Sequence, residues 1–321
     1  MKAAVHDRYG PPEVVRIEDV ERPSPKEDEI LVRVHATTVT QTDCHMRRAR
    51  PYLWRFMLGL RRPKRRVLGL EFAGLAEAVG SAVSEFAVGD RVFGMTYCTH
   101  AEYVCVRESK FVGHMPSSMT FEDAAAVSDG FNQGLGHLKL ANVNERTRLL
   151  VYGASGSCGT AAVQLGKHYF GAHVTAVCDT KNLELVRSLG ADRVIDYTQE
   201  DFTMEGETYD VVLDAVGKHS FLRSRRALKP GGVYVATDRL YNFPLALLMS
   251  RSKRRRVVMT AAARPPKENL HLLRELIEAG KYRPIVDRTY PLEDVVEAYR
   301  YVESWQKTGN VVVTLDGEGA G

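Results

Sequence analysis

Three glycines between residues 153 and 159 are spaced so that the backbone can approach a phosphate group closely. The segment reads Gly-Ala-Ser-Gly-Ser-Cys-Gly, with Gly153, Gly156 and Gly159 as its glycines. It follows the apolar run Leu149–Tyr152 and precedes a segment with helical apolar spacing that starts at Thr160. Glycines in this setting permit a tight turn and leave the N–H groups of a helix start open to a pyrophosphate. The pattern predicts a dinucleotide site that includes Ser155 and Ser157; the alternative is a tight turn that binds nothing.

The residues at the end of the next expected strand determine whether the site prefers NAD or NADP. An acid there binds the ribose 2′-hydroxyl of NAD, whereas a cation accepts the 2′-phosphate of NADP. Asp179 lies about 20 residues beyond Gly159, the usual offset, and favours NAD, while Thr180 and Lys181 beside it suit a phosphate. Asp179 is equally suited to cap the helix expected next, and in that role it says nothing about the cofactor.

These residues need a parallel sheet to position them. From Arg148 onward, apolar strand-like runs alternate with helix-like segments, the order that produces a doubly wound sheet. The expected strands are 149–152, 173–178, 193–197, 209–213, 233–237 and 257–260. The expected helices between them are 160–169, 182–189 and 220–228, the last one stopped by the Lys-Pro-Gly-Gly segment at 229–232.

A second, β-rich unit is expected ahead of this sheet. Short alternating runs broken by turn formers, with few helical periods, predict strands at 30–35, 72–79, 90–93 and 101–106. Two amphipathic helices at 267–279 and 292–304 and a last strand at 310–315 follow the sheet, and we expect that strand to return to the first unit. The predicted domains are therefore 1–119, completed by 262–321, and 120–261.

Composition narrows the function classes. A net charge of +4 from 44 basic and 40 acidic residues is too balanced for nucleic acid as the main partner. Basic residues nevertheless cluster at 61–66 and 251–256; nucleic-acid or membrane binding would need them on one face with aromatics between them, and a solvated loop is the plainer interpretation. Five irregularly spaced cysteines favour a reducing compartment, which we take to be the cytoplasm. We expect no membrane-spanning segment, because no uncharged apolar run reaches 18 residues.

Longer motifs carry a family resemblance. The segments GASGSCGTAAVQLGKHYFGAHVTAV, LVRSLGADRVIDY, YDVVLDAVG, LKPGGVYV and KTGNVVV, together with LGLEFAG and VGDRVFG near the start, resemble the medium-chain dehydrogenase/reductase superfamily in its zinc-free, quinone-oxidoreductase-like branch. The resemblance covers nearly the whole chain. It implies an α/β protein with a GroES-like β-rich catalytic domain, a Rossmann domain, an active site in the cleft between them, and a homodimer formed through a sheet edge.

The resemblance also bears on metal. Zinc enzymes of the superfamily have a cysteine at the position of Thr40, a histidine at Leu70 and a cysteine at Asp129. Since Leu70 cannot coordinate and a catalytic zinc needs about three protein ligands, we expect no zinc. The pairs Cys44–His45 and Cys98–His100 are interpreted as packing residues; the alternative is that the two pairs meet and bind a metal.

Without zinc, fixed hydrogen-bond donors must stabilise charge on the substrate oxygen. In the resembled branch a tyrosine after the V-x-x-x-D stretch lies near the substrate, which makes Tyr52 the candidate donor and Thr40 a second one; packing of Tyr52 in a surface loop is the alternative. Asp43 is expected to be a structural hydrogen-bond anchor.

The cofactor contacts follow from the same resemblance. Asn132 and Gln133 stand where relatives have a small residue and a threonine near the nicotinamide, so substrate identity transfers poorly. Lys181 and Tyr197 match a 2′-phosphate site, which favours NADP(H) and leaves NAD(H) open. Val216 and Asn310 complete the expected contacts.

Three functions remain open. The first is hydride transfer from NADPH to a quinone or an activated C=C bond of a small hydrophobic substrate. The second is a zinc-independent alcohol or ketone oxidoreductase, and the third is a dinucleotide-binding sensor or scaffold with little turnover. The apolar stretches 52–60 and 241–249 are candidate linings for a hydrophobic, acidic or thioester-linked substrate, with core packing or a subunit contact as alternatives.

Overall fold

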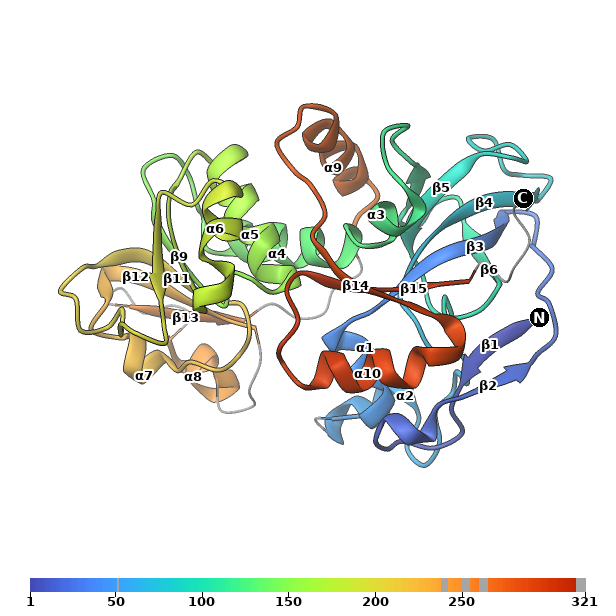
Figure 1. The fold of residues 1–321 in the computed structure, drawn as a ribbon, viewed down its shortest axis with the longest axis horizontal. Coiled ribbons are helices and arrows are strands. Elements are labelled where there is room, and N and C mark those ends of the chain that lie inside the picture. Colours follow the sequence, from blue (N-terminus) through green and yellow to red (C-terminus); the bar gives the residue numbers. More distant parts are fainter. Residues whose placement is uncertain (51, 238–241, 250–254, 260–264, 316–321) are drawn as a thin grey trace. The chain divides into compact units, whose positions relative to one another are not determined.

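The computed structural model describes residues 1–50, 52–237, 242–249, 255–259 and 265–315 (Figure 1). The chain forms two compact units, which we describe separately. The first contains residues 1–128, 265–275 and those from 284 onward; the second contains 129–264 and 276–283. The boundary lies at 128/129 instead of the expected 119/120, because the helix α3 (Phe121–Ala125) packs on strands of the first unit.

The first unit is built on a mainly antiparallel sheet in the order β14-β15-β3-β4-β5-β7, with β6 paired to β3. The four strands expected from alternating apolar residues are confirmed. Buried valines, alanines and phenylalanines on their inner faces form the core, which α10 covers. The strands are β3 (Glu29–Val39), β4 (Glu71–Val79), β5 (Arg91–Met95), β6 (Tyr103–Arg107), β7 (Val112–His114), β14 (Val286–Pro291), β15 (Asn310–Thr314) and the separate pair β1 (Lys2–Val5) and β2 (Arg16–Asp19).

The last strand returns to the first unit, as expected. β15 pairs antiparallel with β3, with Val311 opposite Val39 and Thr314 opposite Ala36. The strand β14 beside it was not expected, because its residues are at most half-buried and lack an apolar alternation. It forms because β15 offers it a parallel partner.

Helices in the first unit are more frequent than the sequence indicated. The expectation of few helices there was wrong for α1 (Gln41–Arg48), the turn Tyr52–Trp54 and α2 (Arg55–Leu58), which are polar or short. The expected helix 292–304 begins as the turn Leu292–Asp294 and continues as α10 (Val295–Glu303), whose inner face is fully buried. The helix α9 (Glu268–Glu278) is also confirmed. No helix within the described ranges is long and apolar enough to cross a membrane.

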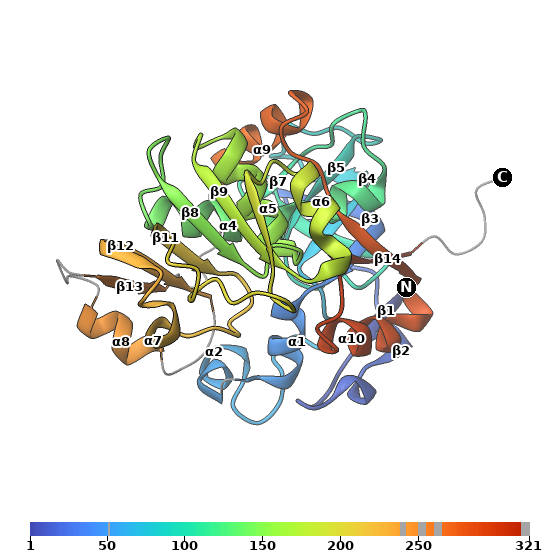
Figure 2. The same cartoon turned by 60° about the vertical axis from the view of Figure 1, so that its left-hand side comes forward.

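The second unit is a six-stranded, all-parallel sheet in the order β10-β9-β8-β11-β12-β13 (Figure 2). The order runs outward from β8 to β10 and then reverses from β11 to β13, so the sheet is doubly wound as expected. Its strands are β8 (Arg148–Tyr152), β9 (His173–Cys178), β10 (Arg193–Asp196), β11 (Tyr209–Asp214), β12 (Leu228–Ala236) and β13 (Arg256–Met259). Its helices are α4 (Ser128–Leu140), α5 (Ser157–His168), α6 (Leu183–Ser188), α7 (Phe221–Ser224) and α8 (Asn242–Met249).

The role assigned to the Lys-Pro-Gly-Gly segment was wrong. Residues 229–232 lie inside β12 and do not stop a helix, and α7 already ends at Ser224. The register against β11 shifts there, from Tyr209 opposite Leu228 to Val211 opposite Val233. Proline and glycine are tolerated in a strand where pairing is interrupted, so the segment is a bulge.

Three of the buried histidines among the described residues have lowered pKa values. His6, His100 and His137 are almost fully buried, and desolvation lowers the pKa of each ring to about 4. The ring of His100 is further held by a 2.8 Å contact between Nε2 and the carbonyl oxygen of Thr38. The folded chain therefore holds these rings neutral at pH values where an unfolded chain protonates them.

Replacing His100 tests this coupling. Between pH 6.5 and pH 4 the His100 ring binds a proton in the unfolded chain but not in the folded chain. The free energy of unfolding therefore falls on acidification. A pKa lowered to about 4 makes the contribution of one such ring about 3 kcal/mol. In urea unfolding across this pH range, the free energy of unfolding of His100→Asn should fall less steeply with decreasing pH than that of the wild-type protein. The exposed His168→Asn is the control, and parallel curves for His100→Asn and wild type would contradict the assignment.

Candidate functional site

The glycine loop lies at the reversal point of the doubly wound sheet. Gly153 follows β8 directly, and Val216 lies just beyond β11, the strand beside it. Gly153 has φ of +79°, and a Cβ on it would lie 2.5 Å from Val216 Cγ1. The crevice outside the carboxyl ends of the strands at such a point is where α/β sheets bind ligands.

Gly159 lets α5 cross the loop at close range. A Cβ on Gly159 would lie 2.1 Å from the carbonyl oxygen of Gly153, a distance that no side chain can accept. Any larger residue at 159 would push the start of α5 away from β8. The fold itself therefore requires the first and third glycines of the pattern, Gly153 and Gly159, and neither of them indicates a ligand by itself.

Gly156 has no such internal reason to be glycine. Its φ is −79° and a Cβ on it would lie 3.7 Å from the nearest atom, the carbonyl oxygen of Gly153, so other residues fit the fold there. Gly156 is the N-cap residue of α5 and supplies no side-chain cap. The first N–H groups of a helix have no partner inside it, and the N-cap residue of α5 makes no side-chain capping bond to them. A ligand that approaches the backbone closely would account for a glycine at this position.

Serine hydroxyls border the same helix start. Among the described residues none forms a hydrogen bond to the buried Oγ of Ser157. Gly130 on α4 lies against this hydroxyl, because a Cβ on Gly130 would be 2.7 Å from Ser157 Oγ. The sequence interpretation missed Gly130; only the close approach of α4 to the loop reveals it. We therefore expect the loop to offer its backbone N–H groups to an anion, with Ser155 beside them, while the Ser157 hydroxyl is buried against Gly130.

The expected ribose residues lie together at the ends of β9 and β10. Asp179 occupies the N-cap position of the turn Thr180–Asn182, but its side chain makes no capping bond and accepts a 2.5 Å hydrogen bond from Asn182 Nδ2. Lys181 Nζ lies 4.0 Å from Asp179 Oδ2. Thr180 Oγ1 donates to Asp196 Oδ2 at 2.5 Å.

The two residues that match a phosphate site, Lys181 and Tyr197, are both exposed. The side chain of Lys181 is 56% exposed, and Tyr197 is 52% exposed. Burial, with Asp179 and Asp196 nearby, raises the pKa of Tyr197, so its hydroxyl remains a donor at neutral pH. An ammonium group and a phenol at this edge suit a 2′-phosphate, while the Asp179 carboxylate opposes it.

The remaining cofactor candidates divide between the units. Gln133 lies on α4 and donates from Nε2 to Asp129 Oδ2 at 2.7 Å, one turn away. Asn310 belongs to the first unit, where its backbone N–H and Nδ2 both donate to the carbonyl oxygen of Ile285. The structure thus brings Val216 to the glycine loop and leaves Asn310 in a structural contact within the other unit.

Thr40 and Asp43 form a reciprocal cap at the start of α1. Thr40 Oγ1 donates to Asp43 Oδ2 at 2.7 Å and accepts from the Asp43 N–H at 3.1 Å, and the Thr40 N–H donates to the same carboxylate. Asp43 is a hydrogen-bond anchor, as expected. The hydroxyl hydrogen of Thr40 is directed at Asp43, so in this geometry it does not reach another oxygen.

Tyr52 stands on the surface of the first unit with a cation beside it. It begins the turn before α2 and is 62% exposed. The guanidinium carbon of Arg55 lies 5.1 Å from the centre of the Tyr52 ring and 5.0 Å from that of Tyr9. The Tyr9 hydroxyl donates to the carbonyl oxygen of Gly59 at 2.7 Å, which fixes the loop that carries Tyr52.

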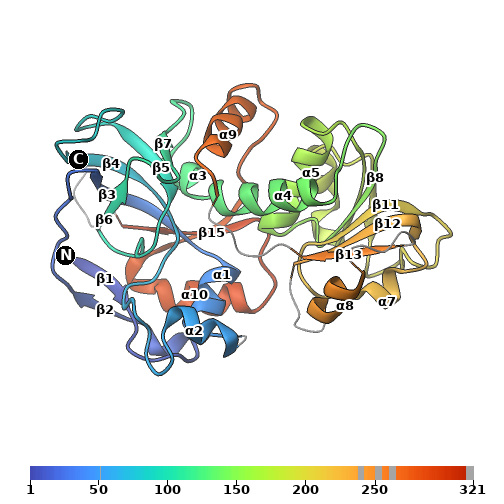
Figure 3. The same cartoon turned by 180° about the vertical axis from the view of Figure 1, so that it is seen from behind.

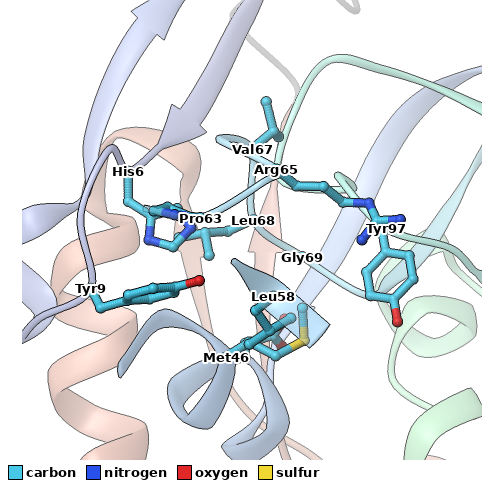
Figure 4. A pocket seen from close by; sticks show the side chains of 11 residues that line it. His6, Tyr9, Met46, Leu58, Pro63, Arg65, Val67, Leu68, Gly69 and Tyr97 are labelled. Atoms are coloured by element: carbon cyan, nitrogen blue, oxygen red, sulfur yellow. The ribbon is translucent and has the colours of Figure 1, made fainter. Parts of the chain in front are cut away.

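A small cavity lies behind this loop (Figure 4). Its volume is about 20 Å³, which admits one water molecule. His6, Tyr9 and Asp43 supply its polar lining, while Met46 and Leu58 supply apolar lining. Within the described chain no group donates to Asp43 Oδ1, and burial raises the pKa of this carboxyl to about 6. The carboxyl therefore holds a proton, or a water in the cavity, more readily than an exposed aspartate.

The residues at the zinc positions do not form a metal site. Thr40 is engaged with Asp43, Asp129 accepts from Gln133, and Leu70 has no donor atom. In the part of the chain that the structure describes, no group of three or more His, Cys, Asp or Glu side chains could hold a metal ion. The donor set does not fit a catalytic zinc.

Comparisons with known proteins agree with this arrangement. Residues 26–131 match the family model for the alcohol dehydrogenase GroES-like domain, and residues 189–313 match the one described as zinc-binding dehydrogenase. The chain is 32% identical to the 2-methylene-furan-3-one reductase of Solanum lycopersicum, over 98% of this chain and 79% of that protein. It is 31% identical, with the same coverage, to the chloroplastic NADPH-dependent alkenal/one oxidoreductase of Arabidopsis thaliana. Among solved structures, the quinone oxidoreductase from Coxiella burnetii superposes with a TM-score of 0.88 at 26% identity, over 98% of this chain and 99% of that one.

Two glycine replacements distinguish an effect on stability from an effect on NADPH binding. Gly156→Ala should leave stability nearly unchanged and weaken NADPH binding at least tenfold, because the added methyl fits the fold but stands where the phosphates approach. Gly136→Ala on α4 is the matched control, since a Cβ there meets nothing within 4 Å. Binding would be measured by the fluorescence of NADPH and stability by thermal unfolding. Equal NADPH affinity in both variants would remove the loop as the binding site.

Proposed function

Because the chain belongs to the medium-chain dehydrogenase/reductase superfamily, in its quinone-oxidoreductase-like branch, we propose that it transfers hydride from NADPH to a quinone or an activated C=C bond. The observation that carries this proposal is Gly156, a helix-start glycine that neither its φ nor its surroundings require. The names of the two plant relatives, a 2-methylene-furan-3-one reductase and an alkenal/one oxidoreductase, support an enone-type acceptor.

NADP(H) is the proposed cofactor, with NAD(H) used less well. Lys181 and Tyr197 are exposed at the ends of β9 and β10, where a 2′-phosphate would be bound. The Asp179 carboxylate works against the phosphate, but Asn182 holds one of its oxygens. The printed name of the Arabidopsis relative, an NADPH-dependent enzyme, supports the same choice.

Charge on the substrate oxygen must be stabilised during the reaction. When bound, the reduced nicotinamide supplies a hydride to the substrate carbon, and the electron pair of the C=C or quinone bond moves toward the oxygen. The proposed role of Tyr52 is to donate its hydroxyl hydrogen to that oxygen. Arg55, 5.1 Å from the ring centre, stabilises the negative charge that develops on Tyr52 as its proton moves. A proton from solvent or from the Asp43 cavity then restores the Tyr52 hydroxyl, so the substrate gains one hydride and one proton in total.

Thr40 is a weaker candidate donor than Tyr52. To donate to a substrate, its hydroxyl would have to give up the 2.7 Å bond to Asp43 and weaken the cap of α1. We therefore assign the stabilisation of the oxygen to Tyr52 and a positioning role to Thr40.

The remaining features of the proposal concern the setting of the enzyme. The lack of suitable ligands at Leu70 supports catalysis without zinc. We propose a cytoplasmic homodimer, formed through β10 or β13, the two edge strands of the parallel sheet. The substrate is proposed to be a small hydrophobic molecule, and nucleic acid is not a proposed partner.

A substrate panel run with both cofactors tests the function. We expect NADPH to be oxidised with enones or quinones, and NADH to be oxidised more slowly. Reversible oxidation of alcohols would instead indicate an alcohol or ketone oxidoreductase. NADPH binding without turnover across enones, quinones and ketones would contradict the proposal and favour a sensor or scaffold.

Replacing Tyr52 tests the donor. Tyr52→Phe keeps the ring beside Arg55 and removes the hydroxyl, so kcat/KM for an enone should fall about 100-fold, the usual loss for one oxygen-stabilising donor, with NADPH affinity unchanged. Tyr169→Phe, at a partly exposed tyrosine in the second unit, is the control. An unchanged kcat/KM would show that Tyr52 only covers the surface.

A further inference from the structure

The loop of residues 50–66 in the first unit, which we call the basic apolar loop, has an unusual charge pattern. Between Asp43 and Glu71 the sequence contains nine lysines and arginines and no acidic residue. Arg47 and Arg48 both pair with Glu303, which lies outside this segment. A stretch with one sign of charge attracts an oppositely charged partner.

Most cations of the loop have no carboxylate partner. Of its basic residues, only the last, Arg66, forms ion pairs within the described chain, with Asp7 and Glu18. Arg55 and Arg65 contact aromatic rings instead, Arg65 at 4.1 Å from the centre of Tyr97. Ion-pair partners within the described chain are lacking for the other cations, namely Arg50, Arg61, Arg62 and Lys64.

Large apolar side chains stand exposed among these cations. Phe56 is 70% exposed, Met57 69% and Leu60 61%, all within five positions. Several large apolar side chains exposed together are uncommon on the surface of a soluble monomer and often mark an interaction site. Here they lie beside cations that have no carboxylate partner.

Helical geometry explains why these side chains point outward. The turn Tyr52–Trp54 runs directly into α2, so residues 52 and 56 are one turn apart and share a side. Leu58 lies on the other side, where it lines the cavity together with Met46 (Figure 4). In Figures 1 and 3, α2 lies at the periphery of the first unit next to α1.

The backbone holds the loop in this conformation. Gly59 has φ of +124°, and a Cβ on it would lie 2.1 Å from the carbonyl oxygen of Arg62, so only glycine allows the chain to turn back there. The Lys64 N–H donates to the carbonyl oxygen of Leu58 at 2.8 Å and closes the turn. The Tyr9 hydroxyl holds Gly59 from outside the loop at 2.7 Å. The exposure of the apolar side chains is therefore built into the fold.

We propose that the basic apolar loop docks this protein on an anionic membrane surface. Phe56, Met57 and Leu60 enter the boundary between headgroups and acyl chains, and the cations around them lie against lipid phosphates. A nucleic acid would use the cations but gain little from the aliphatic side chains, so charge and apolar exposure together favour lipid. The inference concerns attachment and does not depend on the proposed reaction.

The sequence repeats this order of residue types once more. Residues 243–249 read Phe-Pro-Leu-Ala-Leu-Leu-Met, and residues 251–256 contain five lysines and arginines. In the second unit, Leu245, Ala246 and Met249 of α8 pack on the core, while Leu248 is 80% exposed. Tyr241, Arg251, Lys253 and Arg254 lie outside the described residues.

Vesicle binding tests the proposal. The protein would be sedimented with vesicles of phosphatidylcholine alone and with vesicles that also contain phosphatidylglycerol. We expect binding only to the anionic vesicles, and weaker binding as salt rises. The triple variant Arg61→Gln, Arg62→Gln, Lys64→Gln should bind them about 100-fold more weakly, from the usual contribution of each cation near a lipid surface.

Two further variants make the result specific. Phe56→Ser with Met57→Ser should also lose vesicle binding, although the charge is unchanged. The control triple Lys139→Gln, Arg146→Gln, Arg226→Gln removes the same charge from exposed positions elsewhere and should bind like the wild-type protein. NADPH binding verifies that every variant is folded.

Several outcomes would overturn the proposal. One is equal vesicle binding by the wild-type protein and the loop triple. Another is equal loss in the loop triple and the control triple, which would show that net charge alone is responsible. A third is loss of binding to an RNA or DNA fragment, or to a phosphate-bearing thioester, in the loop triple without any change in vesicle binding.

Discussion

The contact between Gly159 and the carbonyl oxygen of Gly153 is the constraint on which the site depends. Only the absence of a side chain at 159 lets α5 start directly over the end of β8. The start of α5 therefore lies at the point where the sheet reverses its strand order, and the first N–H groups of a helix are suited to an anion. Gly130 permits a similar close approach of α4, where it lies against Ser157. We propose that backbone packing forms an anion site here before any charged side chain contributes.

In the first unit, side-chain contacts hold the candidate residues in place. Its residues near the proposed substrate oxygen are held by hydrogen bonds and cation contacts, since Thr40 and Asp43 cap α1 and Arg55 lies between two tyrosine rings. The same loop that carries Tyr52 exposes apolar and cationic side chains beyond it. A hydrophobic acceptor dissolved in a lipid surface would reach such a protein by diffusion along that surface, which links attachment to substrate supply.

Sequence reasoning was strongest where local pattern and tertiary packing agree. The strand β9 was predicted with its bounds, because a buried parallel strand is a mostly apolar run, which Thr175 alone interrupts after His173. The same reasoning failed for β14, whose residues pair with β15 without being buried, and for the bulge at 229–232, because a proline-glycine pair ends helices more often than it interrupts strands. The glycine loop was predictable from spacing. The contacts of Asp179, Thr40 and Gly130 were not, since they depend on partners brought together by the fold.

The most direct test of the account is a titration of the ¹⁵N-labelled protein with NADPH, followed through backbone amide shifts. The account predicts that the largest shifts belong to the amides from Ser155 to Gly159, with smaller ones near Lys181 and Tyr197. Inorganic pyrophosphate should move the first group alone. If the amides of the glycine loop stay in place while NADPH binds elsewhere, the central claim is contradicted.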